Sequence, residues 1–239
     1  MKLIITGASG YVGQELVRQS LKRPEITTVV ALSRKPVSAH GDVAGDSNAA
    51  KLRSVVIEDY GEYPENVRKE FEGADACIWT VAITPTKSRA YDFKDVVQVC
   101  QNSTMAGLKA MFESDVSKPF RFLYMSGIGV ERDLTKRPAW MPEYALMRGQ
   151  TENQILAFAA EHPGQIEASA AKPGLITTPG RPIASMFARM ASWTGKVPYI
   201  DLGVIATAML DQVINGFESD ALLNDDVIRM AKGASGPTA

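Results

Sequence analysis

The stretch that decides the fold lies at the start of the chain and reads Leu3-Ile4-Ile5-Thr6-Gly7-Ala8-Ser9-Gly10-Tyr11-Val12-Gly13. Its apolar run predicts a short buried parallel strand, and apolar residues at helical spacing predict a helix over residues 12–21. A strand, a glycine turn and a helix in this order form the usual binding site for the pyrophosphate of a dinucleotide. The alternative is an ordinary glycine turn, but its place directly after the first strand favours the dinucleotide.

Each of the three positions in this turn requires glycine for a different physical reason. Gly7 permits the tight turn, Gly10 lets the backbone approach the pyrophosphate, and Gly13 lets the helix pack closely on the strand. The free N–H groups and the positive dipole end of the helix then attract the anion. The residues expected to hold the pyrophosphate are Gly7, Ser9, Gly10, Tyr11, Val12 and Gly13.

Strand and helix signals alternate through most of the chain. Strands are predicted at residues 28–32, 54–57, 75–83, 120–125 and 166–171, and helices at 66–71, 93–112 and 144–160. This alternation predicts an α/β fold, a Rossmann-type doubly wound parallel sheet with right-handed crossovers. After residue 174 the sequence predicts a loop at 177–181, helices at 183–193 and 202–217, a short strand at 197–200 and a frayed tail at 233–239. We therefore expect a single domain over residues 1–239, with roughly residues 175–239 contributing a small substrate-side lobe.

Composition and charge exclude several classes of function. The 239 residues are 45% hydrophobic, which suits one α/β domain, and the net charge of -1 favours neither nucleic acid nor an anionic membrane. The N-terminal apolar run is too short for a signal peptide core, and no run is long enough to span a bilayer. Cys77 and Cys100 are expected to be reduced core thiols, which fits the cytoplasm. His40 and His162 lie in unrelated contexts, so no metal site is expected.

The G-x-x-G-x-x-G spacing resembles the short-chain dehydrogenase/reductase superfamily, in particular its extended and atypical branches with sugar-nucleotide epimerases and NmrA-like proteins. The resemblance continues at least to Gly174. It implies a cofactor site that also includes residues after the third, fourth and sixth strands. These residues are Asp59 and Tyr60 near the adenine, Thr80, Val81 and Ala82 along the ribose, and Pro173 and Gly174 beside the nicotinamide. An exposed turn would explain Asp59 almost as well.

The end of the second strand bears on the choice of cofactor. An acidic residue there binds ribose hydroxyls, whereas arginine accommodates a 2′-phosphate. The chain has Ser33, Arg34 and Lys35 at this point and no carboxylate, and arginine can hold a phosphate with two parallel hydrogen bonds. We therefore expect NADP(H) rather than NAD, the alternative being a pair of solvated charges.

The catalytic group of the superfamily is matched only in part. The resemblance implies a tyrosine that transfers the proton, a lysine four residues later that lowers its pKa, and a serine that orients the carbonyl. Tyr144 has the expected place, but Arg148 stands where lysine is expected; its charge is expected to favour tyrosinate and its guanidinium to bind ribose hydroxyls. Gly127 occupies the usual serine position, and the neighbouring Ser126 is the candidate hydroxyl.

These features predict an NADP(H)-dependent oxidoreductase or epimerase-like enzyme that acts on a small carbonyl or hydroxyl compound, with Tyr144 as the proton donor or acceptor. The alternatives are a non-redox isomerase, cyclase or dehydratase, and a non-catalytic sensor similar to NmrA-like regulators. The expected partner is a small-molecule substrate, and a homodimer stays open because superfamily members often dimerise. The residues expected to line an apolar pocket, or else the core of the small lobe, are Trp140, Met141, Phe187, Met190 and Trp193.

Overall fold

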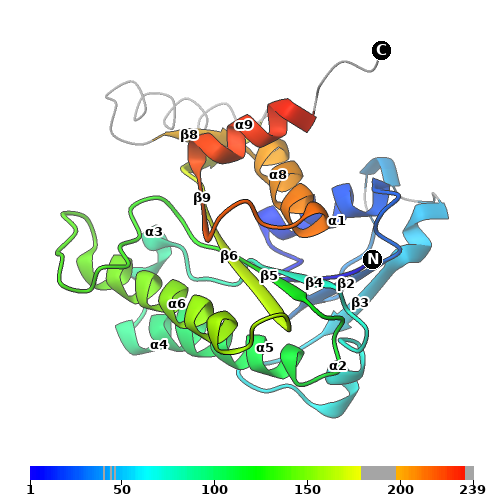
Figure 1. Cartoon of the computed structure of the whole chain (residues 1–239), viewed down its shortest axis with the longest axis horizontal. Helices are drawn as coiled ribbons and strands as arrows, with labels where there is room; N and C mark the ends of the chain where they lie inside the picture. The colour runs from blue at the N-terminus through cyan, green and yellow to red at the C-terminus, as the bar shows by residue number, and fades with distance from the viewer. Residues whose placement is uncertain (40, 44, 46, 179–197, 235–239) are drawn as a thin grey trace.

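The computed structural model describes residues 1–39, 41–43, 45, 47–178 and 198–234. Its centre is a parallel sheet of seven strands in the order β3-β2-β1-β4-β5-β6-β9 (Figure 1). The strand bounds are β1 Lys2–Thr6, β2 Thr28–Ser33, β3 Leu52–Val56, β4 Ala76–Trp79, β5 Phe120–Met125, β6 Ile166–Lys172 and β9 Ala221–Leu223. The chain builds outward from β1 to β3 and then restarts at β4 on the other side of β1. The carboxyl ends of β1 and β4 therefore form the crevice in which such sheets bind ligands.

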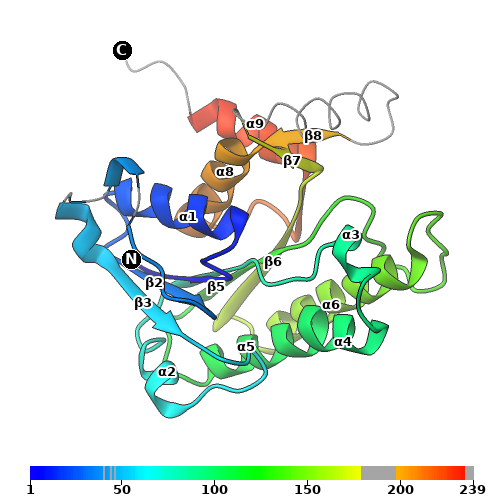
Figure 2. The ribbon, with the colours of Figure 1, turned by 180° about the vertical axis from the view of Figure 1, so that it is seen from behind.

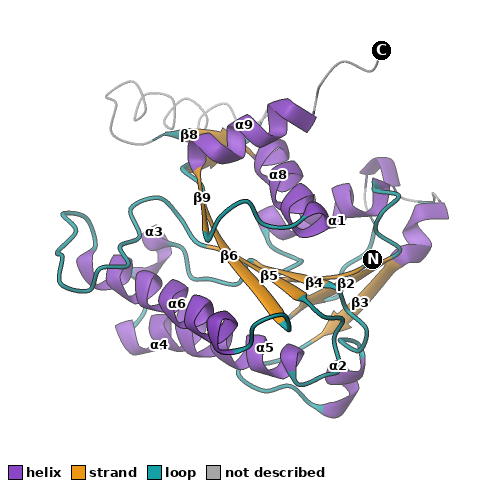
Figure 3. Ribbon diagram, viewed as in Figure 1, coloured by secondary structure: helices purple, strands orange, loops and turns teal. Residues whose placement is uncertain are grey.

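Helices cover both faces of this sheet. Figures 1 and 2 show α1, α8 and α9 over one face and α2, α4, α5 and α6 over the other, and Figure 3 shows the resulting three layers. The helix bounds are α1 Tyr11–Lys22, α2 Glu65–Lys69, α3 Pro85–Ser88, α4 Phe93–Val97, α5 Ser103–Phe112, α6 Pro142–Glu161, α8 Leu202–Asn215 and α9 Asn224–Ala234. The predicted doubly wound α/β fold is confirmed.

The uninterrupted apolar run of β1 reflects burial on both faces of the sheet. Successive side chains of a strand point to opposite faces, so Leu3 and Ile5 pack in the core with α1 and α8, whereas Ile4 packs in the core with α5. All three side chains are fully buried. A strand with one wet face would have alternated apolar and polar residues instead.

Several element boundaries differ from the sequence-based expectation. The fourth strand ends at Trp79 instead of residue 83, because its pairing with β1 ends at Thr6↔Trp79 and its pairing with β5 ends at Trp79↔Tyr124. The helix expected over residues 93–112 is present as α4 and α5, joined by a π-helical segment at Gln98–Asn102. Two 3-10 turns, Gly41–Val43 and Ser47–Lys51, lie in the described part of the connection from β2 to β3.

Beyond residue 174, most of the described residues pack on the main sheet or extend it. The predicted strand at 197–200 is present as β8 Tyr199–Asp201, which pairs with β7 Leu175–Thr177, and the predicted helix at 202–217 is present as α8. The sequence analysis missed β9 and α9; β9 extends the main sheet beside β6, and α9 packs on α8. The helix expected at residues 183–193 lies outside the described residues, as does most of the tail at 233–239. No helix in the described ranges is long and apolar enough to cross a membrane.

Candidate dinucleotide-binding site

The glycine turn joins β1 to α1 and is crowded on its inner side. Gly7 has a φ of +66°, which L side chains rarely adopt. A Cβ on Gly13 would lie 2.3 Å from the Gly7 carbonyl oxygen, and a Cβ on Gly10 would lie 3.0 Å from the same atom. The turn therefore has no room for larger residues at the first and third glycines, and little at the second.

The N-terminus of α1 is open toward the crevice. Its N-cap is Gly10, so no side chain caps the helix. Within the described residues, the N–H groups of Val12 and Gly13 have no hydrogen-bond acceptor. Uncapped N–H groups at the positive end of a helix dipole are a binding site for an anion such as a pyrophosphate.

Two hydroxyl groups hold this turn from opposite flanks. Gly7 N–H donates to the Tyr60 hydroxyl oxygen at 3.1 Å, and this hydroxyl donates to the Leu32 carbonyl at 3.0 Å. On the β4 side, the Thr80 hydroxyl donates to the Thr6 carbonyl at 2.6 Å, and Thr80 N–H donates to the Thr6 hydroxyl at 3.2 Å. Both side chains were expected beside the cofactor, yet their hydrogen bonds serve the turn itself.

The residues next to Tyr60 and Thr80 in the chain do not hold the glycine turn. Asp59 is exposed, and its carboxylate accepts a hydrogen bond from the Gly61 N–H at 2.8 Å, the pattern of an Asx turn. Val81 and Ala82 continue from Thr80 as half-buried coil along the crevice. Their place after β4 keeps them candidates for lining a ribose.

The three residues at the end of β2 that were expected to bind a 2′-phosphate differ in exposure. Ser33 is buried, and its hydroxyl donates to the Lys35 carbonyl. Arg34 and Lys35 are exposed, and within the described residues their side chains make no hydrogen bond or ion pair. Of these three residues, Arg34 and Lys35 are therefore available to an anion, whereas Ser33 is not.

The first turn of α1 borders a hollow of about 330 Å³ between the helix and the segment after β2. Ser9, Tyr11 and Gln14 line it on the helix side, and residues 36–39 line it on the other. Ser9 is exposed, and the Tyr11 hydroxyl hydrogen-bonds the Thr178 hydroxyl just after β7. The hollow thus adjoins both the glycine turn and the segment that follows Arg34 and Lys35.

Tyr144 lies in the first turns of α6 and donates its hydroxyl proton to the Ile83 carbonyl at 2.9 Å. Burial raises the pKa of its phenol, and the positive charge of Arg148 opposes this increase only in part. Arg148 thus acts on this pKa in the expected direction, but the effect of burial is larger. Tyr144 carries its proton at neutral pH.

Arg148 does not extend into the crevice, although its spacing from Tyr144 is as expected. The residue is only 2% exposed; its guanidinium donates to the Met125 carbonyl at 2.7 Å and lies 4.8 Å from the centre of the Tyr124 ring. Its Nε and Nη1 atoms are buried without a hydrogen-bond partner. The guanidinium is thus placed in the interior of the fold and not where it would bind ribose hydroxyls.

Ser126 belongs to a polar network centred on a glutamate that the sequence analysis missed. Its hydroxyl donates to Glu152, whose fully buried carboxylate also accepts from Arg132 Nε at 2.6 Å and from Lys172 Nζ at 3.2 Å. Arg132 in turn binds the Asp220 carboxylate at 2.8 Å. The spacing of Tyr144, Arg148 and Glu152 by four residues along one helix face was a signal that could have identified Glu152.

Gly127, at the usual serine position, has open space around it: nothing lies within 4 Å of a Cβ built there. The Pro173-Gly174 turn, by contrast, is packed. A Cβ on Gly174 would lie 2.0 Å from the Pro198 carbonyl oxygen, and Pro173 accepts a hydrogen bond from Ile128 N–H at 2.9 Å. Packing against residue 198 therefore suffices to explain this glycine, without a nicotinamide ring.

The expected apolar pocket is visible only in part. Trp140 is 54% exposed, and Met141 packs beside a small core cluster that includes Tyr144 and Cys100. Phe187, Met190 and Trp193 lie outside the described residues. In the described ranges, no group of three or more histidine, cysteine or acidic side chains is arranged to hold a metal ion.

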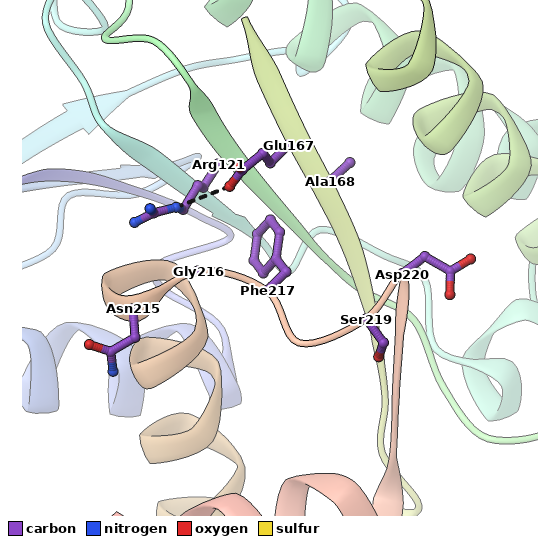
Figure 4. Close-up of a pocket in the computed structure, with 8 residues that line it drawn as sticks. All are labelled: Arg121, Glu167, Ala168, Asn215, Gly216, Phe217, Ser219 and Asp220. Atoms are coloured by element: carbon purple, nitrogen blue, oxygen red, sulfur yellow. Dashed lines mark hydrogen bonds and ion pairs between the residues drawn. The ribbon is translucent and has the colours of Figure 1, made fainter. Parts of the chain in front are cut away.

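A larger hollow, of about 500 Å³, lies away from the glycine turn, at the amino-terminal ends of β5 and β6 (Figure 4). Arg121 and Glu167 pair across its floor at 3.3 Å, and Phe217 lies between them and the end of α8. Arg121 also donates to the Val213 and Ile214 carbonyls and so stabilises the C-terminus of α8. These contacts explain the polar lining without a ligand.

Comparison with known proteins agrees with the site at the glycine turn. Residues 7–161, more than half of the chain, match the family model described as NAD(P)H-binding. The fold and the uncapped helix behind its glycine turn define a Rossmann-type dinucleotide-binding protein. The chain belongs to the NAD(P)H-binding family. A search among curated proteins finds no match.

Solved structures with a similar fold include proteins in complex with sugar nucleotides and NAD. MoeE5 in complex with UDP-glucuronic acid and NAD aligns with a TM-score of 0.69 at 17% identity, covering 99% of this chain and 83% of that one. The dTDP-glucose 4,6-dehydratase DesIV from Streptomyces venezuelae aligns with a TM-score of 0.69 at 15% identity, covering 99% and 81%. UDP-glucose 4-epimerase from Thermotoga maritima gives 0.65 at 13% identity, covering 100% and 84%. At these identities the likeness concerns the fold alone.

Proposed function

We propose that this protein is an NADP(H)-dependent oxidoreductase or epimerase-like enzyme that acts on a small carbonyl or hydroxyl compound. The observation that carries the proposal is an uncapped helix N-terminus together with two exposed cations, Arg34 and Lys35, whose side chains have no hydrogen-bond or ion-pair partner among the residues that the structure describes. The helix end supports binding of the pyrophosphate, and the cations support binding of a 2′-phosphate. NAD(P)H supplies or accepts a hydride in such sites.

The choice of NADP(H) is testable at Arg34. Arg34→Ala should raise the Kd for NADPH by about 10- to 100-fold, because a charge-assisted hydrogen bond contributes about 1.5–3 kcal/mol. The Kd for NADH should change by less than about two-fold, since NADH has no 2′-phosphate. Fluorescence titration with both cofactors measures this difference.

Arg53→Ala serves as the control, because Arg53 is an exposed arginine on β3 without an ion pair among the described residues. It should leave both affinities unchanged. Equal losses for NADPH and NADH in Arg34→Ala would show that Arg34 does not bind the 2′-phosphate.

Tyr144 is the proposed proton carrier. Since burial raises the pKa of its phenol, the group is a proton donor at neutral pH, which suits reduction of a carbonyl more than abstraction of a hydroxyl proton. To act, the hydroxyl must donate to the substrate oxygen instead of the Ile83 carbonyl. Tyr144→Phe should lower NADPH oxidation on a carbonyl panel by about 100- to 10,000-fold, with cofactor affinity retained.

A second candidate is a dinucleotide sensor without turnover. It is favoured by the contacts of Ser126 with Glu152 and of Arg148 with the Met125 carbonyl, which engage two of the three expected catalytic groups within the fold. NADPH binding without oxidation on any carbonyl would favour this candidate. Equal turnover by wild type and Tyr144→Phe would instead remove Tyr144 from the mechanism.

A further inference from the structure

We propose that Tyr60 is a positioning residue of the dinucleotide site, which holds the Gly7 N–H to the end of β2 through its hydroxyl group and does not itself contact the cofactor. This inference rests on the proposed binding of NADP(H) at the glycine turn. It differs from the adenine contact that the resemblance implied for residues 59 and 60.

The hydroxyl continues the hydrogen-bonding ladder past the point where the strands separate. β1 and β2 pair up to Thr6↔Leu32, and Gly7 then turns away with its φ of +66°. Beyond this point the Leu32 carbonyl accepts from Ala8 N–H at 3.2 Å and from the Tyr60 hydroxyl at 3.0 Å, while Gly7 N–H donates to the same hydroxyl at 3.1 Å. The Tyr60 oxygen thus accepts and donates as a peptide group would in a longer strand pair.

The position of this hydroxyl is fixed by the packing of its ring. Tyr60 is 8% exposed, and its ring meets the fully buried Trp79 ring edge-on, with 5.8 Å between centres and 70° between planes. Burial raises the pKa of Tyr60 to about 12, so the hydroxyl keeps its proton and remains a donor to Leu32 at neutral pH. A fixed ring and a retained proton make the bridge a rigid part of the turn.

The bridge engages an N–H group of the turn that would otherwise face a pyrophosphate. Gly7 N–H is used by Tyr60, whereas the N–H groups of Val12 and Gly13 at the helix end have no acceptor among the described residues. Thr80 holds the opposite flank of the turn through Thr6. Without the Tyr60 hydroxyl, the β2 flank of the turn keeps only the hydrogen bond from Ala8 N–H to the Leu32 carbonyl, so the helix end is held less firmly in relation to Arg34.

Tyr60→Phe with Tyr63→Phe as a matched control tests the inference. The Tyr63 hydroxyl is also buried but has no hydrogen-bond partner in the described ranges, so its removal breaks no bond. Tyr60→Phe should raise the Kd for NADPH about ten-fold, equivalent to the net contribution of a hydrogen bond, and Tyr63→Phe should change it by less than about two-fold. Fluorescence titration is done at a temperature where thermal melts show every variant folded.

The outcomes separate this inference from the proposed function. If wild type fails to bind NADPH, the proposed function is wrong. If wild type binds and Tyr60→Phe has the wild-type Kd, the inference is overturned, even where the variant is less stable, because its role is then only structural. Should Tyr60→Phe not fold, hydrogen exchange in wild type decides: a protected Gly7 amide supports the bridge, and one that exchanges like the amides of Val12 and Gly13 overturns it.

Discussion

Arg148 stands where the superfamily resemblance implies a lysine, and its contacts differ from those expected of that lysine. Arginine is larger than lysine and stays charged in proteins, and here its guanidinium is buried against Tyr124 and the Met125 carbonyl. No carboxylate in the described residues forms an ion pair with it, and two of its nitrogens lack partners. A buried charge with so few partners costs stability, so the guanidinium of Arg148 contributes little to the stability of the fold.

Arg148→Met should therefore leave the free energy of unfolding unchanged or raise it by about 1–2 kcal/mol, since a buried charge is replaced by an apolar chain of similar length. Urea denaturation measures the change. Arg121→Met is the control: Arg121 binds Glu167 and two carbonyls at the end of α8, so its loss should destabilise. A loss above about 3 kcal/mol in Arg148→Met would show that the charge stabilises the fold.

At the scale of single elements, α6 organises the candidate catalytic end of the crevice. Its residues 144, 148 and 152 lie on one face and contact three different segments: the coil after β4, the end of β5, and the loop before α6 together with β6. Glu152 makes the last of these contacts, with Arg132 and Lys172. Its carboxylate also accepts the hydrogen bond from the Ser126 hydroxyl. The helix thus determines which segments of the fold these side chains contact.

Glu152→Gln should lower the free energy of unfolding by about 3–5 kcal/mol, because Arg132 and Lys172 would lose their buried counter-charge while the shape is kept. Thermal melts should show a decrease in Tm of about 2–4 °C per kcal/mol for a chain of this size. Glu161→Gln, an exposed change at the end of the same helix, should have an effect below about 0.5 kcal/mol. Equal melting of the two variants would mean that the network contributes little.

At the scale of the whole molecule, the core on the α5 side of the sheet and the small cluster beside it bury several tyrosines. Burial raises the pKa of Tyr60 to about 12 and also raises those of Tyr63, Tyr124 and Tyr144. In the unfolded chain these phenols lose their protons near pH 10. Above that pH the folded protein binds more protons than the unfolded chain, so stability falls as pH rises.

The free energy of unfolding should consequently be insensitive to these groups below about pH 10 and fall steeply above it, by about 1.4 kcal/mol per pH unit for each buried phenol. Urea unfolding between about pH 8 and about pH 11 measures the slope. Tyr60→Phe should reduce the slope between about pH 10 and 12, because one phenol no longer contributes. A slope that is the same in wild type and variant would contradict the raised pKa of Tyr60.

The order of elements follows from local sequence patterns. A run such as Leu3-Ile4-Ile5, followed by glycines and a helical apolar spacing, specifies strand, turn and helix without distant residues. The same holds for β5 and β6, whose apolar runs the sequence analysis placed closely. β9 and α9 were missed because a three-residue strand carries too little pattern, and only its place beside β6 makes it a strand.

What the sequence determines by itself is therefore the class of fold and the position of the glycine turn, since both depend on neighbours in the chain. The tertiary structure alone decides what each matched side chain contacts. It buries Arg148 against the Met125 carbonyl, brings the Ser126 hydroxyl to Glu152, and brings the Tyr60 hydroxyl to the Gly7 N–H. The physical reason is that a hydrogen bond between residues 7 and 60, or between 126 and 152, depends on how the strands and helices pack in space, which local spacing does not encode.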